Sequence, residues 1–435
     1  MHWEQKVEYA ALSDIGLRRR NNQDSYVVQT APDRAFWNEH GHLFLVADGM
    51  GGHAVGELAS KLAADTVPLT FQKQRELELP DALRTSLELA NKSIYERGLQ
   101  NRDFLRMGTT CTTLVLASQG AVVAHIGDSR AYRIRGEIIE QITFDHSLQW
   151  ELIRQGAMTR EEVLEREPRN VITRCLGPEP RVHVDTEGPF PVLPGDVYIL
   201  CSDGLHGLVS DAEIGMIGRE LSPADACQLL VDLANLRGGN DNITVVVAKV
   251  GSLPPGFVSP STIEFEMPKQ GLGWGWLFAV WIEGLAIVMG IALWLLDHRA
   301  EGAFVLGLGC IGLAALGLAG MRIRGNLSQP AEGSTSRKHG SPYRTASAHL
   351  TRHFLTELEK YEFDLQLAAQ DEEWPVVWPV HAEHRREAKV ALEEKGWGAG
   401  LRSLGKALHT LLAGLQQARK AGESVSRKPG NRDRG

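Results

Sequence analysis

The sequence has few cysteines, and none of them forms a disulfide or metal-binding pattern. Its 435 residues include five cysteines, an odd number, with no C-x-x-C pair. A disulfide scaffold and a thiolate zinc site are therefore disfavoured, and buried, reduced thiols in a cytosolic compartment are expected. Positive charge is also in deficit. The net charge of −8 argues against a nucleic-acid protein that works through its global charge.

The amino terminus lacks the apolar stretch of a signal peptide, so none is expected. No internal repeat stands out. Hydrophobic residues make up 43% of the chain and charged residues 23%, a balance that is typical of globular proteins rather than disordered or fibrous ones. At about 100–200 residues per domain, the length suggests more than one folded unit.

Two long hydrophobic runs, residues 272–296 and 302–321, are separated by a short polar stretch. Each is close to the ~20 apolar residues that a helix needs to cross a bilayer, so we expect a transmembrane hairpin. The alternative is a buried hairpin in a soluble core, although such helices are rarely this long. Glu283 lies deep in the first run, where an ionisable group is costly. It is either functional, or stays protonated or faces a partner helix.

The charges around the hairpin predict its orientation. Basic residues follow the second run, whereas the loop at 297–301 carries acidic and basic residues in balance. By the positive-inside rule, both flanks of the hairpin are expected in the cytoplasm. Tryptophans near the helix ends, Trp274, Trp276 and Trp294, fit interfacial anchoring.

Composition divides the chain into segments around this hairpin. A mixed region precedes it, a proline-rich linker leads into it, and a Ser/Gly/Pro-rich linker leads out of it to a charged helical region and a disordered basic tail. The expected boundaries are 1–252 for the mixed region, 253–271 and 322–345 for the linkers, 346–420 for the helical region and 421–435 for the tail.

The amino-terminal region reads as blocks of strands and blocks of helices. Strand-like runs rich in Val, Ile, Leu, Thr and Tyr are 7–13, 43–47, 110–118, 121–126, 131–135, 197–201 and 243–250. Helix-like runs are 57–73, 80–99, 148–154, 212–217 and 223–236. This order favours an α+β fold of antiparallel sheets covered by helices over a doubly wound parallel sheet.

Four aspartates lie at or beside the ends of strand-like runs, each with a glycine at or near it. They are Asp48, Asp128, Asp203 and Asp241. A single Asp-Gly pair is usually a turn, but four strand ends meeting at one rim would form an intensely negative site that needs cations. Oxygen ligands select hard ions, Mg²⁺ or Mn²⁺, over zinc.

These residues also carry a resemblance. The motifs are Arg19-x-x-Asn22-x-Asp24, Asp48-Gly-Met-Gly-Gly-His53, Gly127-Asp-Ser-Arg130, Ser202-Asp-Gly204 and Asp241-Asn-Ile-Thr-Val245. In order and spacing they are similar to the metal-dependent serine/threonine protein phosphatases, the PPM or protein phosphatase 2C family. Residues 145–177 look like the flap segment of its bacterial members. The resemblance covers about residues 5–250 and implies two packed antiparallel sheets flanked by helices.

The resemblance implies a set of metal ligands. Asp48 would bridge two Mn²⁺ or Mg²⁺ ions, and the Gly49 carbonyl would bind one of them. Asp203 and Asp241 would complete the protein ligands of the other ion. Asp128, together with Asp203, would hold a third ion, as in bacterial relatives.

Further residues would act around the metals. Asp24 would act on them through bound water, and Arg19 would grip the phosphate. Met50 stands where the eukaryotic branch has a histidine proposed as general acid. His53 matches the bacterial pattern and would either protonate the leaving alkoxide or structure its loop. Gln23 replaces a glutamate found in many members.

The resemblance thus implies a protein phosphatase that hydrolyses phosphoserine and phosphothreonine by direct attack of a metal-activated water. With the hairpin, it would be a multi-pass protein of the bacterial inner membrane, its enzyme domain and carboxyl terminus facing the cytoplasm. Its expected partners are phosphoproteins, including a cognate serine/threonine kinase, and not nucleic acid. The alternative is a catalytically weak phosphoprotein-binding protein, or a membrane regulatory scaffold that works through residues 346–420.

The carboxy-terminal region shows two apolar helical stripes. They run through 349–368 and 401–415, with a turn expected at Trp374 and Trp378. Two such helices cannot bury both stripes alone, so we expect them to pack on a partner protein, on a second copy in a dimer, or on the inner membrane surface. A protein partner is favoured because anionic lipid would repel the acidic run 371–373, and the alternative is a self-contained solubilising tail.

Overall fold

The structure is a computed structural model. It describes residues 7–51, 54–155, 171–251, 274–310 and 343–426, with Glu162, Val163, Arg166, Pro168 and Gly312 as isolated described positions. Two compact units are present, and each is described by itself. The first comprises residues 1–259 and 339–435, and the second comprises residues 260–338.

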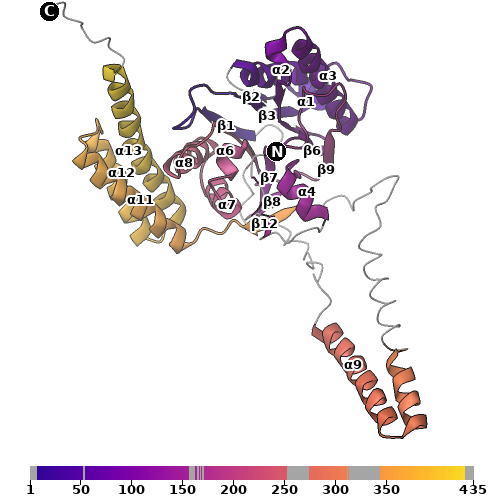
Figure 1. Cartoon of the computed structure of the whole chain (residues 1–435). Helices are drawn as coiled ribbons and strands as arrows, with labels where there is room; N and C mark the ends of the chain where they lie inside the picture. The colour runs from indigo at the N-terminus through magenta and orange to yellow at the C-terminus, as the bar shows by residue number, and fades with distance from the viewer. Residues whose placement is uncertain are drawn as a thin grey trace, which may run out of the picture. The chain divides into compact units, whose positions relative to one another are not determined.

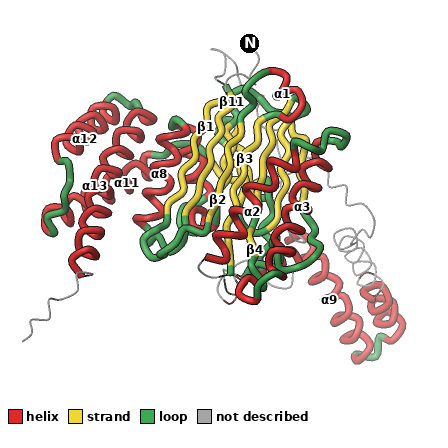
Figure 2. Tube along the Cα trace, turned by 90° about the horizontal axis from the view of Figure 1, so that it is seen from above, coloured by secondary structure: helices red, strands yellow, loops and turns green. Residues whose placement is uncertain are grey.

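The first unit contains two antiparallel β-sheets, which confirms the two-sheet part of the predicted fold class (Figures 1 and 2). One sheet has the order β1 (Val7–Asp14), β11 (Ile243–Val250), β10 (Val197–Cys201), β7 (Arg130–Arg135), β8 (Ile138–Gln141) and β12 (Arg344–Ser347). The other has the order β2 (Asp24–Gln29), β3 (His42–Met50), β5 (Cys111–Ala117), β6 (Gly120–Ile126) and β9 (Asp185–Phe190). The short strand β4 (Gly108–Thr109) pairs with β3.

Alternation along the strands explains why the two sheets pack face to face. Phe44 and Val46 of β3 lie in the apolar layer between the sheets, with Leu200 of β10 and Val246 of β11. The intervening Leu45 points to the opposite face, into a second core under the helices. Successive side chains of a strand face opposite sides, so an unbroken apolar run marks a strand buried on both faces.

Helices cover the outer face of each sheet (Figure 2). The sheet of β3, β5 and β6 packs against α2 (Ala54–Phe71) and α3 (Leu79–Leu99), and α1 (Arg34–His40) leads into β3. The sheet of β7, β10 and β11 packs against α7 (Asp211–Glu220) and α8 (Pro223–Leu236). The helix α4 (Leu148–Gln155) follows β8, and the short α6 (Asp203–His206) follows β10.

The chain after residue 342 corrects the prediction of a linker followed by two helices. Residues 344 and 345, expected in the linker, belong to β12, which pairs with β8. Three helices follow, namely α11 (Arg352–Asp371), α12 (Trp378–Glu393) and α13 (Trp397–Ser426). The tail was expected to be disordered from residue 421, but α13 continues to Ser426, and the rest of the tail lies outside the described residues. Lys395, which has a φ of 60°, and Gly396 provide the additional break between helices.

The apolar stripes of this region pack on the same chain (Figure 1). Leu355 of α11 and Leu404 of α13 belong to the same buried core as Leu229 and Leu233 of α8. The expectation of a partner protein, a second copy or a membrane surface as the cover for these stripes is therefore wrong. Helical periodicity identifies an apolar face, but it carries no information about which surface covers that face.

The second unit contains α9 (Trp274–Leu295) and a second helical segment over residues 299–310. Within the part of the chain that the structure describes, no helix combines the length and apolar character needed to span a bilayer. A Cβ added at Gly312 would lie 2.3 Å from the Glu283 carboxyl carbon. Glu283 therefore faces the neighbouring helical segment, as one of the alternatives for this residue expected.

The cysteines largely follow the prediction of free, buried thiols. Cys111, Cys201 and Cys227 are free and buried, Cys175 is half-buried, and Cys310 is exposed. Burial raises the pKa of the Cys111 and Cys227 thiols to about 12, so both stay protonated and unreactive at neutral pH.

Candidate active site

The site begins where β2 and β3 run side by side. Asp24 at the start of β2 lies directly opposite Asp48 near the end of β3. The backbone of Asp48 is fixed by Thr110, whose N–H donates to the Asp48 carbonyl at 2.8 Å and whose Oγ1 accepts from the Asp48 N–H at 2.9 Å. The two carboxyl-bearing backbones are therefore held at a defined spacing by sheet hydrogen bonds.

The other strand-end aspartates come to the same rim. Asp203 is the first residue of α6, directly after β10, and Asp241 precedes β11. Asp128 follows β6, and its carbonyl accepts a hydrogen bond from His206 Nε2 at 2.9 Å. Repulsion from Asp24, Asp203, Asp128 and Asp241 all acts on Asp48, so the structure brings together every aspartate that the sequence singled out.

Burial and mutual repulsion raise the pKa values of this cluster. Burial raises the pKa of Asp24 to about 7, although hydrogen bonds from Thr244 and Ser202 oppose the shift. Burial and the neighbouring Asp241 raise the pKa of Asp203 to about 6. The pKa values of Asp48 and Asp128 lie well above the ordinary value, chiefly because both are buried. Ionised together, these carboxylates need positive charge beside them.

The donor set fits hard divalent cations. Oδ1 of Asp24, Asp128 and Asp203 is buried and has no hydrogen-bond partner. Buried carboxylate oxygens are costly unless a cation, proton or donor satisfies them, and oxygen-only sites suit Mg²⁺ and Mn²⁺. Among the described residues, no three metal-ligating side chains already enclose a point for a single ion. Asp241 is paired instead with Arg19, whose Nη2 lies 2.6 Å from Asp241 Oδ2.

Two glycines allow the backbone to approach closely here. A Cβ at Gly49 would lie 2.1 Å from the Gly56 carbonyl oxygen, and one at Gly204 would lie 2.1 Å from the Asn242 carbonyl oxygen. Real Cβ atoms do not approach backbone so closely, so a larger residue at either position would push the rim apart. Gly49 and Gly204, beside Asp48 and Asp203, are therefore required by packing, whichever role their carbonyls have.

Arg19 stands at the open side of the cluster. Its side chain is 46% exposed, and it lines a pocket together with Asp48, Gly49, Asp203 and Asp241. A guanidinium at the mouth of an acidic pocket can form paired hydrogen bonds to a phosphoryl group. The other candidate for direct chemistry, His53, lies outside the described residues.

Asn242 is a structural residue of the site that the sequence analysis missed. Its Oδ1 accepts from the Gln23 N–H at 2.9 Å, and its Nδ2 donates to the carbonyls of Ile15 and Asn21 at 3.0 Å each. One buried side chain thus ties down both ends of the loop that carries Arg19. Its position directly after Asp241, within a quoted motif, was the signal for it.

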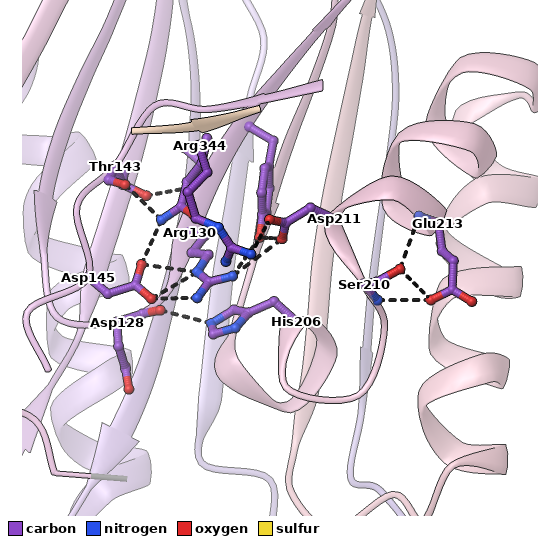
Figure 3. Close-up of polar contacts among 12 residues, drawn as sticks. Asp128, Arg130, Thr143, Asp145, His206, Ser210, Asp211, Glu213 and Arg344 are labelled. Atoms are coloured by element: carbon purple, nitrogen blue, oxygen red, sulfur yellow. Dashed lines mark hydrogen bonds and ion pairs between the residues drawn. The ribbon is translucent and has the colours of Figure 1, made fainter. Parts of the chain in front are cut away.

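Arg130 is the centre of a second polar group that the sequence analysis missed (Figure 3). It is 8% exposed, and its Nη2 donates to Asp145 Oδ2 at 2.6 Å while its Nε contacts both oxygens of Asp145. Its Nη1 donates to the Tyr132 hydroxyl at 3.0 Å and lies 3.4 Å from Asp211 Oδ1. Residues up to 81 positions apart meet here, so sequence spacing carried no signal for this group.

Histidines near the motifs are structural. His125 bonds Thr112 and the Phe144 carbonyl, and burial lowers the pKa values of His125 and His206 to about 3. Both rings stay neutral at physiological pH. Neither is therefore suited to donate a proton to a leaving group at that pH.

Comparison with known proteins agrees with this geometry. The family model described as Protein phosphatase 2C matches residues 18–222. The chain is 38% identical over 240 residues to a putative protein phosphatase 2C-type protein of Streptococcus pyogenes, covering 54% of this chain and 94% of that protein. It is 33% identical over 242 residues to the serine/threonine phosphatase stp of Listeria innocua, covering 54% of this chain and 93% of that protein.

Solved structures give the same result. The Mycobacterium tuberculosis serine/threonine phosphatase PstP/Ppp is 35% identical to this chain and superposes with a TM-score of 0.51, covering 56% of this chain and 99% of that structure. The chain thus contains nearly the full length of each of these relatives, with the aspartates of the motifs gathered at one rim. It belongs to the protein phosphatase 2C family and is a metal-dependent phosphoprotein phosphatase.

Proposed function

We propose that this phosphatase hydrolyses phosphoserine and phosphothreonine esters at a binuclear Mn²⁺ or Mg²⁺ centre by direct attack of water. The observation that carries the proposal is the set of buried, unpartnered carboxylate oxygens of Asp24, Asp128 and Asp203 at one rim. Bound ions would neutralise the phosphate oxygens during in-line attack and make water nucleophilic near neutral pH.

The residues that would hold the ions follow from the placement of the carboxylates. Asp48, with the Gly49 carbonyl, would bind at the end of β3, and Asp203 and Asp241 would bind from the opposite sheet. Asp128 would share a third ion with Asp203. Asp24 would act through water bound to the metals. Ser202 Oγ donates to Asp24 Oδ2 at 2.8 Å and so sets the direction of the other carboxylate oxygen.

Arg19 would bind the phosphate. Its guanidinium presents several donors, and its Nη2 donates a short hydrogen bond to Asp241. A phosphate dianion would compete for this guanidinium, so substrate binding would release Asp241 toward the metal. Arg19 therefore couples phosphate binding to the carboxylates. His53 is proposed as the group that protonates the leaving alkoxide, with a loop-structuring role as the alternative.

The membrane attachment is also a proposal. The apolar runs 272–296 and 302–321, with basic residues after the second run, support a hairpin that tethers the enzyme to the cytoplasmic face of a bacterial inner membrane. Reporter fusions at residues 260 and 435 should both report the cytoplasm, and a fusion within 297–301 should report the outside. Full-length protein recovered without membranes or detergent would contradict the tether.

The test of the enzymatic proposal uses full-length protein and a phosphothreonine peptide. Hydrolysis should require Mn²⁺ or Mg²⁺ and stop in excess EDTA. Asp48→Asn should lower kcat/KM by about a hundredfold or more, as expected for loss of a direct metal contact. Asp65→Asn is the matched control, because Asp65 is exposed on α2.

Two results would contradict the proposal. Full activity in excess chelator would exclude the metal mechanism. A wild-type protein that binds phosphopeptide without hydrolysing it under any metal condition would favour the alternative, a phosphoprotein-binding scaffold.

A further inference from the structure

We propose that Arg344 is a positioning residue that sets the affinity of this phosphatase for the peptide part of its substrate. Arg344 follows the hairpin in the sequence and belongs to β12. The inference rests on the proposed function. It concerns a second pocket, which adjoins the first at Asp203 and Asp241.

The first step is the position of β12. This strand pairs antiparallel with β8, with Arg344 opposite Gln141 and Ser347 opposite Ile138. The pairing extends beyond the strand at both ends. The Tyr343 N–H donates to the Gln141 carbonyl at 3.0 Å, and the Ala348 N–H donates to the Glu137 carbonyl at 2.8 Å. Backbone hydrogen bonds therefore fix where the Arg344 side chain starts.

The second step is what Arg344 contacts. Its Nη2 lies 3.1 Å from Asp211 Oδ2, and its guanidinium carbon lies 5.6 Å from the centre of the Trp150 ring on α4. Figure 3 shows Arg344 extending from β12 to Asp211, beside Arg130. Arg344 thus joins the carboxylate at the start of α7 to the aromatic face of α4.

The third step is the balance of charge around Asp211. This carboxylate, 12% exposed, also accepts a hydrogen bond from the Tyr132 hydroxyl at 3.0 Å and is 3.4 Å from Arg130 Nη1. Because Arg344 compensates Asp211, Arg130 can direct its shorter hydrogen bonds to Asp145. Loss of Arg344 would leave Arg130 as the cation nearest to both Asp211 and Asp145. Arg130 would then bind Asp145 less tightly.

The fourth step links this network to the pocket. Asp145 leads through His146 and Ser147 directly into α4. Asp128, Arg130, Asp145, Trp150, Asp203 and Arg344 all line the second pocket. Tyr343 supports the same wall, since its ring lies 5.4 Å from that of Phe144, which in turn packs 5.7 Å from Trp150.

The consequence concerns the peptide. A phosphoester whose phosphate lies beside Arg19 has its peptide chain free to extend over the adjoining pocket. Arg344 supports the part of that pocket's wall that Asp145 and α4 form, whereas the proposed metal ligands shared by the two pockets, Asp203 and Asp241, are placed by β10 and β11. Arg344 should therefore act on phosphopeptides more than on a small phosphoester.

The experiment compares a phosphothreonine peptide with p-nitrophenyl phosphate, using full-length protein with Mn²⁺. Arg344→Ala should raise KM for the peptide about fivefold, the effect of losing a partly buried ion pair, while both kinetic constants for p-nitrophenyl phosphate change less than about twofold. Arg344→Lys should recover part of the peptide affinity, since it keeps the charge near Asp211 but loses the planar contact with Trp150. Thr345→Ala, exposed on the same strand, is the matched control.

A double-mutant cycle tests whether Arg344 acts through Asp211. In an Asp211→Asn background, Arg344→Ala should have a smaller effect on peptide KM than in the wild type, because the charge that it compensates is gone. Equal effects of Arg344→Ala on both substrates, accompanied by a lower melting temperature, would assign Arg344 a merely structural role and overturn the inference. No change on either substrate would overturn it as well. A wild-type protein inactive on both substrates would instead overturn the proposed function, and this inference with it.

Discussion

Asp24 and Asp48 lie directly opposite each other on neighbouring antiparallel strands, with Asp24 buried and Asp48 half-buried. Like charges directly opposite in a sheet are destabilising. Burial is the largest cause of the raised pKa of both carboxyl groups, and repulsion from Asp24 raises the pKa of Asp48 further. The sheet therefore holds these groups in an arrangement that favours a bound cation, at the expense of stability without one.

The first prediction separates activity from stability at Asp48. In excess EDTA, Asp48→Asn should be more stable than the wild type by about 1 kcal/mol, because it removes a carboxyl group whose ionised form is opposed by burial and repelled by Asp24 and Asp203. In Mn²⁺ the same variant should be nearly inactive. Melting temperatures in chelator and turnover in metal check the two effects. A destabilised variant in EDTA would show that Asp48 is not repelled in the metal-free protein.

The second prediction concerns pH. The pKa values of Asp24 and Asp203, about 7 and about 6, are raised above the ordinary value of 3.8. At pH values between the ordinary pKa of 3.8 and these raised pKa values, the folded, metal-free protein holds more protons than the unfolded chain. Its stability should therefore fall as pH rises from 5 to about 7.5. Saturating Mn²⁺ should largely abolish this dependence, because cations replace the protons.

Thermal melts at several pH values, with EDTA and with Mn²⁺, measure this difference. The Mn²⁺-loaded protein is the internal control, since groups remote from the site contribute equally to both series. Parallel curves for the two conditions would contradict the assignment of a shared cation site.

The third prediction concerns Arg19. Arg19→Ala should raise KM for a phosphopeptide about tenfold and lower kcat less, since a charge-assisted contact to the phosphate is lost. Mn²⁺ affinity should not weaken, because the variant also releases Asp241 from its ion pair. Steady-state kinetics and metal titration measure these effects. Arg34→Ala, an exposed arginine of α1 that does not line this pocket, is the control. An unchanged KM for Arg19→Ala would remove Arg19 from the phosphate site.

The fourth prediction concerns the docked helices. Leu404→Asp places a charge in the core that α13 shares with α8, so it should destabilise the protein by about 3 kcal/mol or more. Lys406→Asp, exposed on the same helix, should change stability by less than about 0.5 kcal/mol. Chemical denaturation of both variants measures the difference. Equal stability of the two would show that the helices are not packed on α8 in solution.

The same interface predicts how a fragment of residues 1–252 behaves in solution. Composition marks this segment as a separate region, yet removal of the rest uncovers the edge of β8 and the apolar face of α8. Exposed strand edges and apolar patches promote association. The fragment is therefore expected to be less soluble than the full-length protein.

Some elements were predictable from sequence and others were not. The strands at 197–201 and 243–250 were predicted with their observed bounds, because both are mostly apolar and rich in residues that favour buried strands. The strands β2 and β8 were missed. Ile138-Ile-Glu-Gln141 has only four residues, too few to show a period, and the apolar run of Asp24-Ser-Tyr-Val-Val-Gln29 is flanked by polar residues. Neighbouring strands supply the hydrogen bonds that make them strands.

The sequence by itself determined the chemistry of this protein. Four aspartates at strand ends, Asp48, Asp128, Asp203 and Asp241, are enough to predict an oxygen-ligand metal site, because ligand type follows directly from residue type. The roles expected of Arg19 and Asp24 came from the resemblance to the family. Only the tertiary structure decided which surfaces meet. The pairing of β12 with β8, the contact of Arg344 with Asp211 and the packing of α13 on α8 join residues remote in the chain. Such contacts depend on how the whole backbone is arranged, and periodicity encodes an apolar or polar face without encoding what lies against it.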